Sequence, residues 1–396
     1  MMTCEFDRRR FLQWTGAGIF GTLSAQLSLE SLASAASTSP LPANTPILVL
    51  ITLYGGNDGL NTVVPFTDPT YQSVRSNIAL SSSQVLPFND SLGFNAVMPS
   101  INALYGQSKV AIVQGVSYPN PSLSHFSSMA IWQTASLTST VSSGWIGRWL
   151  DIQPHNAFNA IGIGATLPPV FVGEKSVASM VDVSGIQLPF GAAAPLVPRL
   201  GSSSPVDVPL EADAATAIND MYSTASVLTP LLPKLLSGPA ISQQLSLIST
   251  LINANVPTRV WEVNLSTFDT HASEQGDQNA LLGQVDAAVG AFMTSISGGS
   301  RARDVTVMIY SEFGRRVMSN ASDGTDHGTA GPVLLIGNSV KGGLYGELPP
   351  LNSLDVNGNL KVTTDFRSVY GGLLQDVLST QVSDVIPGWT SALSVH

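Results

Sequence analysis

The chain has 396 residues, with 17 basic and 27 acidic side chains and a formal charge of −10 at pH 7. Hydrophobic residues make up 44% of the chain, which is enough for a large core and excludes a wholly disordered protein. Only 11% of the residues are charged, and the balance is acidic, which argues against a general nucleic-acid binder. The length fits one large α/β domain or two smaller ones.

Residues 1–35 have the pattern of a secretory signal peptide. Arginines at positions 8–10 precede Phe-Leu, an apolar stretch covers 14–29, and small residues stand at 33–35. The paired arginines resemble a twin-arginine (Tat) signal, so we expect the Tat translocon as a partner and a periplasmic or extracellular location. The alternative is a retained anchor, but the apolar stretch is short and interrupted, and we expect no stable membrane span after cleavage. The only cysteine, Cys4, leaves with the signal, so the mature chain can form no disulfide.

Beyond a linker at 36–45, the chain alternates strand and helix patterns. Apolar runs rich in β-branched residues predict buried strands at 47–53, 110–113, 260–265, 305–310 and 333–336. Apolar residues three or four apart predict a helix over 281–296, ended by two glycines, and weaker helices near 212–223 and 241–254. Strand, helix and strand in succession indicate an α/β domain over 46–396, with 150–255 as an insertion or cap.

Polar residues gather where these strands end. Asp58 and Asn61 follow the first run, Ser124 and His125 the second, Asp269 and His271 the third, and Glu312, Arg315 and Arg316 the fourth, while Asp326 and His327 precede the fifth. Ligands in open α/β sheets bind outside the carboxyl ends of the strands. Carboxylates and imidazoles together suit a divalent metal ion such as zinc or manganese. Each motif alone also fits an ordinary turn or helix cap, and a domain whose polar loops have no such role stays open.

The same segments resemble a known family. Residues 54–65 (YGGNDGLNTVVP), 124–126 (SHF), 268–271 (FDTH), 311–315 (SEFGR), 324–328 (GTDHG) and 342–346 (GGLYG) together resemble the domain-of-unknown-function family numbered 1501. That family is typically Tat-exported and similar to the alkaline phosphatase and sulfatase superfamily. The resemblance implies a three-layer αβα sandwich with a largely parallel central sheet.

The resemblance also implies roles for individual residues. Asp58, Asp269, His271, Glu312 and His327 correspond to metal ligands, with Asp326 beside them, and Ser124 at a helix start corresponds to the nucleophile. The family's superfamily commonly has a histidine after the acid at the Glu312 position. This chain has Phe313 there, so the expected ion count is one or two.

We therefore expect an exported hydrolase of phosphate or sulfate esters, with Zn, Mn or Ca as cofactor and an anionic ester as substrate. Divalent ions offset the charge that repels nucleophiles from such esters. Ser124 would attack, with His125 and Arg315 as further catalytic residues, while Arg316 and Asn61 would hold substrate oxygens. The alternative is a non-catalytic, metal-stabilised binding or scaffold protein of the cell envelope, which the Phe313 departure favours.

Overall fold

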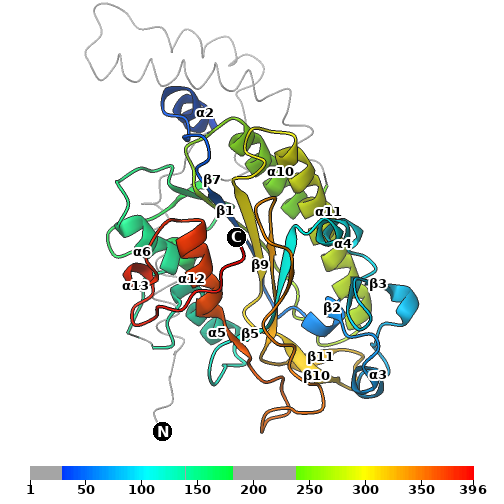
Figure 1. Ribbon diagram of the computed structural model, residues 1–396. Coiled ribbons are helices and arrows are strands. Elements are labelled where there is room, and N and C mark those ends of the chain that lie inside the picture. The colour runs from blue at the N-terminus through cyan, green and yellow to red at the C-terminus, as the bar shows by residue number, and fades with distance from the viewer. Residues whose placement is uncertain (1–28, 139, 182–237) are drawn as a thin grey trace, which may run out of the picture.

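The computed structural model describes residues 29–138, 140–181 and 238–396. Nine of the described strands form one central sheet (Figure 1). They are β1 Ile47–Leu53, β5 Val110–Ser117, β6 Ala160–Ile163, β7 Ser179–Val181, β8 Val260–Leu265, β9 Val305–Tyr310, β12 Gly331–Ile336, β13 Gly343–Tyr345 and β14 Thr364–Asp365. Their order is β13-β5-β12-β9-β1-β8-β6-β7, with β14 paired to β5. Each of the five predicted strands is therefore confirmed.

The sheet is mostly parallel, as predicted. Strand β1 runs parallel to both β8 and β9, and β6 runs parallel to β7 and β8. The exception is β12, which pairs antiparallel with β5 and with β9. Strand β12 therefore begins at the end of the sheet where β5 and β9 finish.

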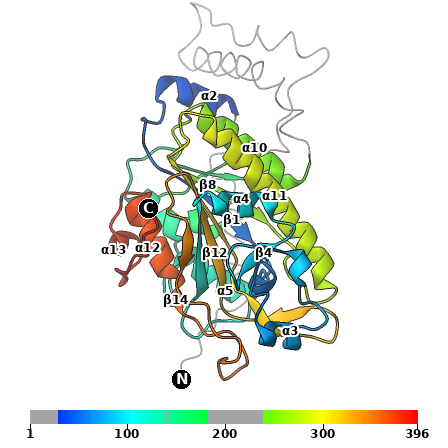
Figure 2. The ribbon, with the colours of Figure 1, turned by 45° about the vertical axis from the view of Figure 1, so that its right-hand side comes forward.

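Helices cover both faces of the sheet (Figures 1 and 2). One face carries α2 Leu29–Thr38, α4 Pro99–Gly106, α10 Ala240–Asn253 and α11 Glu274–Ser297, and the other carries α5 His125–Thr134, α6 Trp145–Asp151, α12 Phe366–Asp376 and α13 Val382–Val385. Successive residues of a strand point to opposite faces. Each face therefore has its own hydrophobic core. In β1, Val49 and Ile51 belong to the first core, on the side of α10 and α11, and Leu48 and Leu50 belong to the second core, on the side of α6 and α12. The predicted three-layer αβα sandwich is confirmed.

Helix α11 begins earlier than the predicted 281–296, at Glu274, and ends at Ser297 with Gly298 as its C-cap. Its apolar residues are buried against the sheet and α10. By length and composition α11 is the one described helix that could cross a membrane, but half of that stretch is buried inside the protein. It is packed as a core helix.

Smaller elements lie at the edge where the parallel strands end (Figure 1). A three-stranded sheet consists of β2 Val63–Val64, β4 Gly93–Asn95 and β3 Val85–Pro87, and a hairpin consists of β10 Arg315–Ser319 and β11 Thr325–His327. Helix α3 Pro69–Val74 and the short helices η3 Gly59–Asn61 and η4 Ser82–Gln84 accompany them. The remaining short helix, η5 Pro169–Phe171, lies elsewhere, beside α6. Leu60, Tyr71 and Val317 share a third core, which ties η3, α3 and β10 together.

The segment predicted as an insertion, 150–255, contributes to the main fold where the structure describes it. Residues 160–163 and 179–181 form strands β6 and β7 of the central sheet, and α10 confirms the helix predicted near 241–254. The helix predicted near 212–223 lies outside the described residues. Helix α2 runs across the predicted signal cleavage site, with Leu32 and Ala35 buried.

Candidate metal centre

The topology brings four segments that are far apart in the sequence to one rim of the sheet, the end at which its parallel strands finish. Strands β1, β8 and β9 end there because they are parallel, and β12 begins there because it is antiparallel. The β10–β11 hairpin pairs Arg315 directly with His327. Helix α5 is fastened to the same rim by Ser128, whose hydroxyl donates to the backbone carbonyl of Glu312 at 2.6 Å.

One carboxylate oxygen stands at the centre of the predicted site. Asp269 Oδ1 lies 3.0 Å from Nε2 of His271, 3.1 Å from Nε2 of His327 and 3.4 Å from Nε2 of His125. Arg315 donates to the same oxygen at 2.7 Å. Donor atoms of Asp269, His125 and His327 all lie within 4.8 Å of one another. Three imidazoles and one carboxylate, drawn from three remote segments, therefore converge on one point.

The other ring nitrogen of two of the three histidines already has a hydrogen-bond partner. His125 Nδ1 lies 2.8 Å from Glu312 Oε1, and His327 Nδ1 lies 2.7 Å from the backbone carbonyl of Leu123. A carbonyl oxygen can only accept, so His327 donates from Nδ1 and directs the Nε2 lone pair into the cluster. His271 Nδ1 lies 3.5 Å from Asp326 Oδ1. Histidines that ligate metals are held in this way, by acceptors behind the ring.

Two observations show that these residues fit a metal ion. His125 Nε2 is buried and makes no hydrogen bond among the described residues, although a buried nitrogen normally has a partner. Nε2 of His271 and Nε2 of His327 are only 3.0 Å apart, so a proton or a cation is needed between their lone pairs. Imidazole nitrogens with a carboxylate oxygen are ligands that Zn²⁺ and similar ions prefer.

Charges around the cluster favour the ionised carboxylate. Burial raises the pKa of Asp269, but the hydrogen bond and charge of Arg315, together with the neighbouring His327 and His125 rings, outweigh it and hold the pKa at about 2. The hydrogen bond to Glu312 raises the pKa of His125. Arg315 is itself buried and donates to the carbonyls of Gly55, Gly56, Phe268 and Thr325 as well as to Asp269. It therefore positions Asp269, and its donors are shared among protein acceptors.

Phe313 packs beneath the cluster. Its ring centroid lies 4.8 Å from that of His125 and 5.0 Å from that of His327, and its side chain is 2% exposed. A Cβ at Gly56 would collide with this ring, so a residue without a side chain is needed there. Phe313 contributes an apolar wall to the site, which limits solvent access to the imidazoles.

The remaining predicted residues of the rim lie around this cluster. Ser124 is exposed at the N-cap of α5, and its hydroxyl does not cap the helix. It stands between Leu123 and His125, which are both fastened to the site. Asp326 is exposed beside His271, and Arg316 is half-buried on β10.

Asp58 and Asn61 lie inside the protein with other partners. Asp58 is fully buried in an ion pair with Arg75, whose guanidinium donates at 2.6 Å to Oδ2 and at 3.0 Å to Oδ1. Asn61 donates to the carbonyl of Ile78 and accepts from the hydroxyl of Tyr71. The structure therefore does not bring these two side chains into the His–Asp cluster.

Sequence reasoning missed three groups beneath the rim. Arg75 neutralises Asp58, and Ser311 donates to Glu312 Oε2 at 3.0 Å. Glu274 is buried at the first turn of α11, where burial and the charge of Asp58 raise its pKa to about 9. Glu274 could have been found as an acid at the start of a helix, and Ser311 as a polar residue directly after β9. Nothing in the sequence pattern around Arg75 marked that residue.

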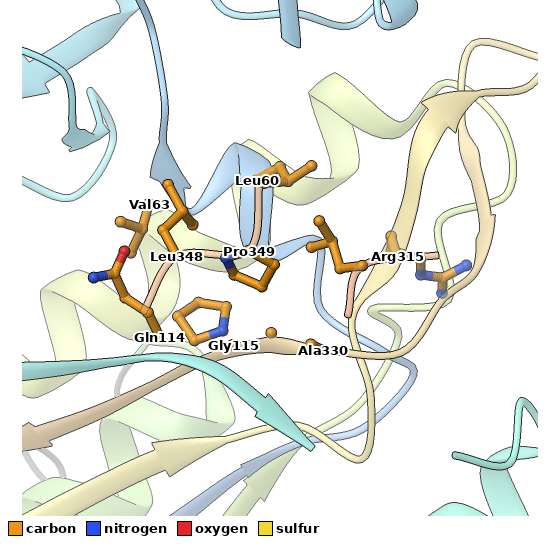
Figure 3. Close-up of a pocket in the computed structure, with 12 residues that line it drawn as sticks. Leu60, Val63, Gln114, Gly115, Arg315, Ala330, Leu348 and Pro349 are labelled. Carbon is orange, nitrogen blue, oxygen red and sulfur yellow. The ribbon is translucent and has the colours of Figure 1, made fainter. Parts of the chain in front are cut away.

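A small apolar cavity borders the site from within (Figure 3). Leu60, Pro349 and Ala330 line it, with Arg315 on the side opposite Gln114. Its volume of 30 Å³ has room for about one or two water molecules and none for an ester. The His–Asp cluster, by contrast, is open, because the side chains of Asp269 and His271 are 45% and 44% exposed. A ligand of this site would therefore bind on the rim.

The fold and the site together define an α/β protein with a histidine–carboxylate cluster at the carboxyl edge of its sheet. The chain is similar to a solved protein of the alkaline phosphatase superfamily from Vibrio parahaemolyticus, with a TM-score of 0.43 and 12% identity over 88% of this chain and 74% of that chain. It is similar to murine ectonucleotide pyrophosphatase/phosphodiesterase 5 in complex with AMP, with a TM-score of 0.42 and 9% identity over 88% of this chain and 97% of that chain. The C-terminal periplasmic domain of EcEptC from Escherichia coli in complex with Zn matches with a TM-score of 0.37 and 10% identity, over 76% of this chain and 77% of that chain.

The family comparison covers the part of the site that the later segments of the chain contribute. The model of the family described as "Protein of unknown function (DUF1501)" matches residues 199–371, which include the motifs around Asp269, Glu312 and His327. The predicted resemblance to that family is confirmed over this segment. A search of curated proteins finds no match.

Proposed function

We propose that this protein is a metal-dependent hydrolase of phosphate or sulfate esters. One observation carries the proposal: the Nε2 atoms of three histidines surround a single oxygen of Asp269, on an exposed rim, with hydrogen-bond acceptors behind two of the rings. His125, His327 and Asp269 would hold the ion, with His271 beside them. A divalent ion held there supplies positive charge that offsets an anionic ester and lowers the pKa of a hydroxyl group or water beside it.

Ser124 is the nucleophile in this proposal. Its hydroxyl is exposed at the start of α5, next to two residues that are fastened to the cluster. The first backbone N–H groups of a helix and the helix dipole favour an anion at this position. Arg316, one residue from the buried Arg315, is the cation proposed to hold substrate oxygens through its planar fork.

The test is hydrolysis of aryl phosphate and aryl sulfate esters by the purified chain, with Zn²⁺, Mn²⁺ or Ca²⁺ added in turn. We expect turnover with at least one metal, loss of turnover on chelation, and a loss of at least 10²-fold in kcat for S124A. The matched control is S127A, one turn into the same helix. Absence of turnover with all three metals would contradict the proposal. Stabilisation by metal without turnover would favour the non-catalytic scaffold.

We also propose export of the folded protein through the Tat route, with cleavage near residue 35. The support is the sequence pattern of residues 1–35 alone. Replacing Arg8 and Arg9 by lysine keeps the charge and removes the twin-arginine pattern. We expect this variant to stay in the cytoplasm in a fractionation experiment, while the wild-type chain reaches the periplasm or medium. Equal export of the two chains would contradict the Tat route.

A further inference from the structure

The resemblance to the family implies Asp58 as a metal ligand, but the structure gives this carboxylate a different cation. The side chains of Asp58 and Arg75 are both 0% exposed. Arg75 donates one N–H to each Asp58 oxygen, and the N–H of Leu60 also approaches Oδ1 at 3.3 Å. Both carboxylate oxygens therefore already have strong donors, in a two-pronged geometry that a planar guanidinium forms well.

Arg75 is itself held in place. Its Nε donates to the carbonyl of Val317 at 2.8 Å, and its Nη2 donates to the carbonyl of Arg316 at 2.6 Å. These carbonyls belong to β10, which also carries Arg315. The guanidinium is thus a fixed part of the interior, because its removal would take two donors from a buried carboxylate and one donor from each of two carbonyls.

A second acid that the resemblance implies as a metal ligand, Glu312, is occupied too. Glu312 is 1% exposed, and its Oε1 accepts from the backbone N–H of Gly55 at 2.9 Å and from His125 Nδ1 at 2.8 Å. Its Oε2 accepts from the hydroxyl of Ser311. The next residue, Phe313, has no donor atom to offer a metal. Asp58 and Glu312 therefore do not fit the role of ligands to a second ion.

We infer that this centre binds one divalent ion per chain, and that the buried guanidinium of Arg75 supplies the positive charge that a second ion would otherwise bring to Asp58. This inference rests on the proposed metal-dependent function. It assigns His125, His327 and Asp269 as ligands, with His271 beside them, and gives Glu312 a supporting role behind His125. The charge on Arg75 is permanent, so the inner part of the rim stays neutralised whether or not metal is bound.

The test is metal stoichiometry, which does not depend on activity. The full chain is loaded with Zn²⁺, freed of excess metal and analysed by elemental mass spectrometry, and Zn²⁺ binding is titrated by calorimetry. We expect one equivalent per chain. Two equivalents would overturn this inference and leave the proposed hydrolase standing. No bound Zn²⁺, Mn²⁺ or Ca²⁺ would overturn the proposed metal centre itself.

A pair of variants examines Asp58 directly. D58L/R75M removes both buried charges and keeps a similar volume, which proteins often tolerate better than removal of one partner. We expect it to bind one equivalent with affinity within about threefold of wild type. R301M/D304L is the matched control, because Arg301 and Asp304 form a buried pair 3.0 Å apart just before β9, at the opposite end of the strand. H327A should bind no tightly held Zn²⁺.

A folded D58L/R75M protein that has lost its equivalent would overturn the inference, since Asp58 would then be a ligand. Circular dichroism and thermal unfolding show whether the variant folds. If it does not fold, R75K serves instead, because lysine keeps the charge but cannot form the two-pronged contact. We expect R75K to bind one equivalent. A folded R75K protein that has lost its equivalent would contradict the assignment, because metal binding would then depend on the Asp58–Arg75 pair, whereas a second equivalent in R75K would agree with it, because Asp58 would accept an ion only once the guanidinium is gone.

Discussion

The position and charge of the Asp269 carboxylate are set by contacts with neighbouring side chains more than by burial. Its side chain is 45% exposed, yet one of its oxygens meets a guanidinium and three imidazoles. The imidazoles of His125 and His327 are oriented by acceptors other than Asp269, the carboxylate of Glu312 and the backbone carbonyl of Leu123. At the scale of single residues, the strength of metal binding should therefore depend on these acceptors as well as on the ligands.

We predict that E312Q weakens Zn²⁺ binding by about 10- to 100-fold. Glu312 accepts from Nδ1 of His125 at 2.8 Å, and a neutral amide both orients that ring less firmly and lowers the basicity of its Nε2. Competition with a chelating dye measures the affinity. D326N is the control, because Asp326 is exposed and 3.5 Å from the His271 ring, so its effect should be smaller than tenfold. Equal affinities in wild type and E312Q would contradict this prediction.

Strand β8 carries an ionisable group in the middle of the sheet. Glu262 is 1% exposed, and within the part of the chain that the structure describes its side chain accepts one long hydrogen bond, from Asn264 at 3.5 Å. Burial raises the pKa of Glu262 from 4.5 to about 7. Since the native state prefers the protonated acid, its stabilising effect is complete below pH 4.5 and is lost as the pH rises to about 7.

We predict that E262Q removes this pH dependence. The difference in the free energy of unfolding between E262Q and wild type should grow in favour of the variant between pH 4.5 and 7, by about 3 kcal/mol, and stay constant above that. Urea unfolding at a series of pH values measures it. Measuring the difference between the two proteins cancels the contribution of the other acids. A difference that does not change with pH would show that Glu262 is solvated or paired in solution.

The loop after β1 needs a glycine at position 55. Gly55 has φ +119°, and a Cβ there would lie 2.5 Å from the backbone nitrogen of Asp269. We predict that G55A destabilises the protein by at least about 2 kcal/mol and displaces Asp269, with loss of metal binding. G276A is the control, because Gly276 lies in α11 with open space around it, and alanine there should stabilise by about 0.5–1 kcal/mol. Unchanged unfolding and metal binding in G55A would refute the close contact.

At the scale of elements, the sequence predicted the strands and helices, whose positions follow from the hydrophobic pattern. It did not predict the direction of an individual strand or the pairing of side chains, which depend on how distant segments approach one another. The run at 260–265 predicted β8 residue for residue, and the first four residues of that strand are buried. The antiparallel direction of β12 has no local signal, yet it is what brings His327 to the rim. The partnership of Asp58 with Arg75 joins residues 17 positions apart through the third core, and no spacing rule predicts it.

The whole molecule gains a crosslink if the proposed ion binds. His125, Asp269 and His327 come from the start of α5, the loop after β8 and the end of β11, which the chain connects only through long intervening segments. A ligand that binds the native state and not the unfolded state stabilises the native state by mass action. The layers on both faces of the sheet should therefore melt together at a higher temperature when metal is present.

We predict that saturating Zn²⁺ or Mn²⁺ raises the midpoint of thermal unfolding, with a gain of about 2.7 kcal/mol at a free metal concentration of 100 Kd. Chelation should reverse the rise. D269N should abolish it, because the central oxygen would lose its charge, while S124A should keep it, since Ser124 is proposed to react with substrate and not to hold the ion. Differential scanning calorimetry measures the shift. An equal shift in D269N would place the metal elsewhere on the acidic surface, and loss of the shift in S124A would make that hydroxyl a ligand.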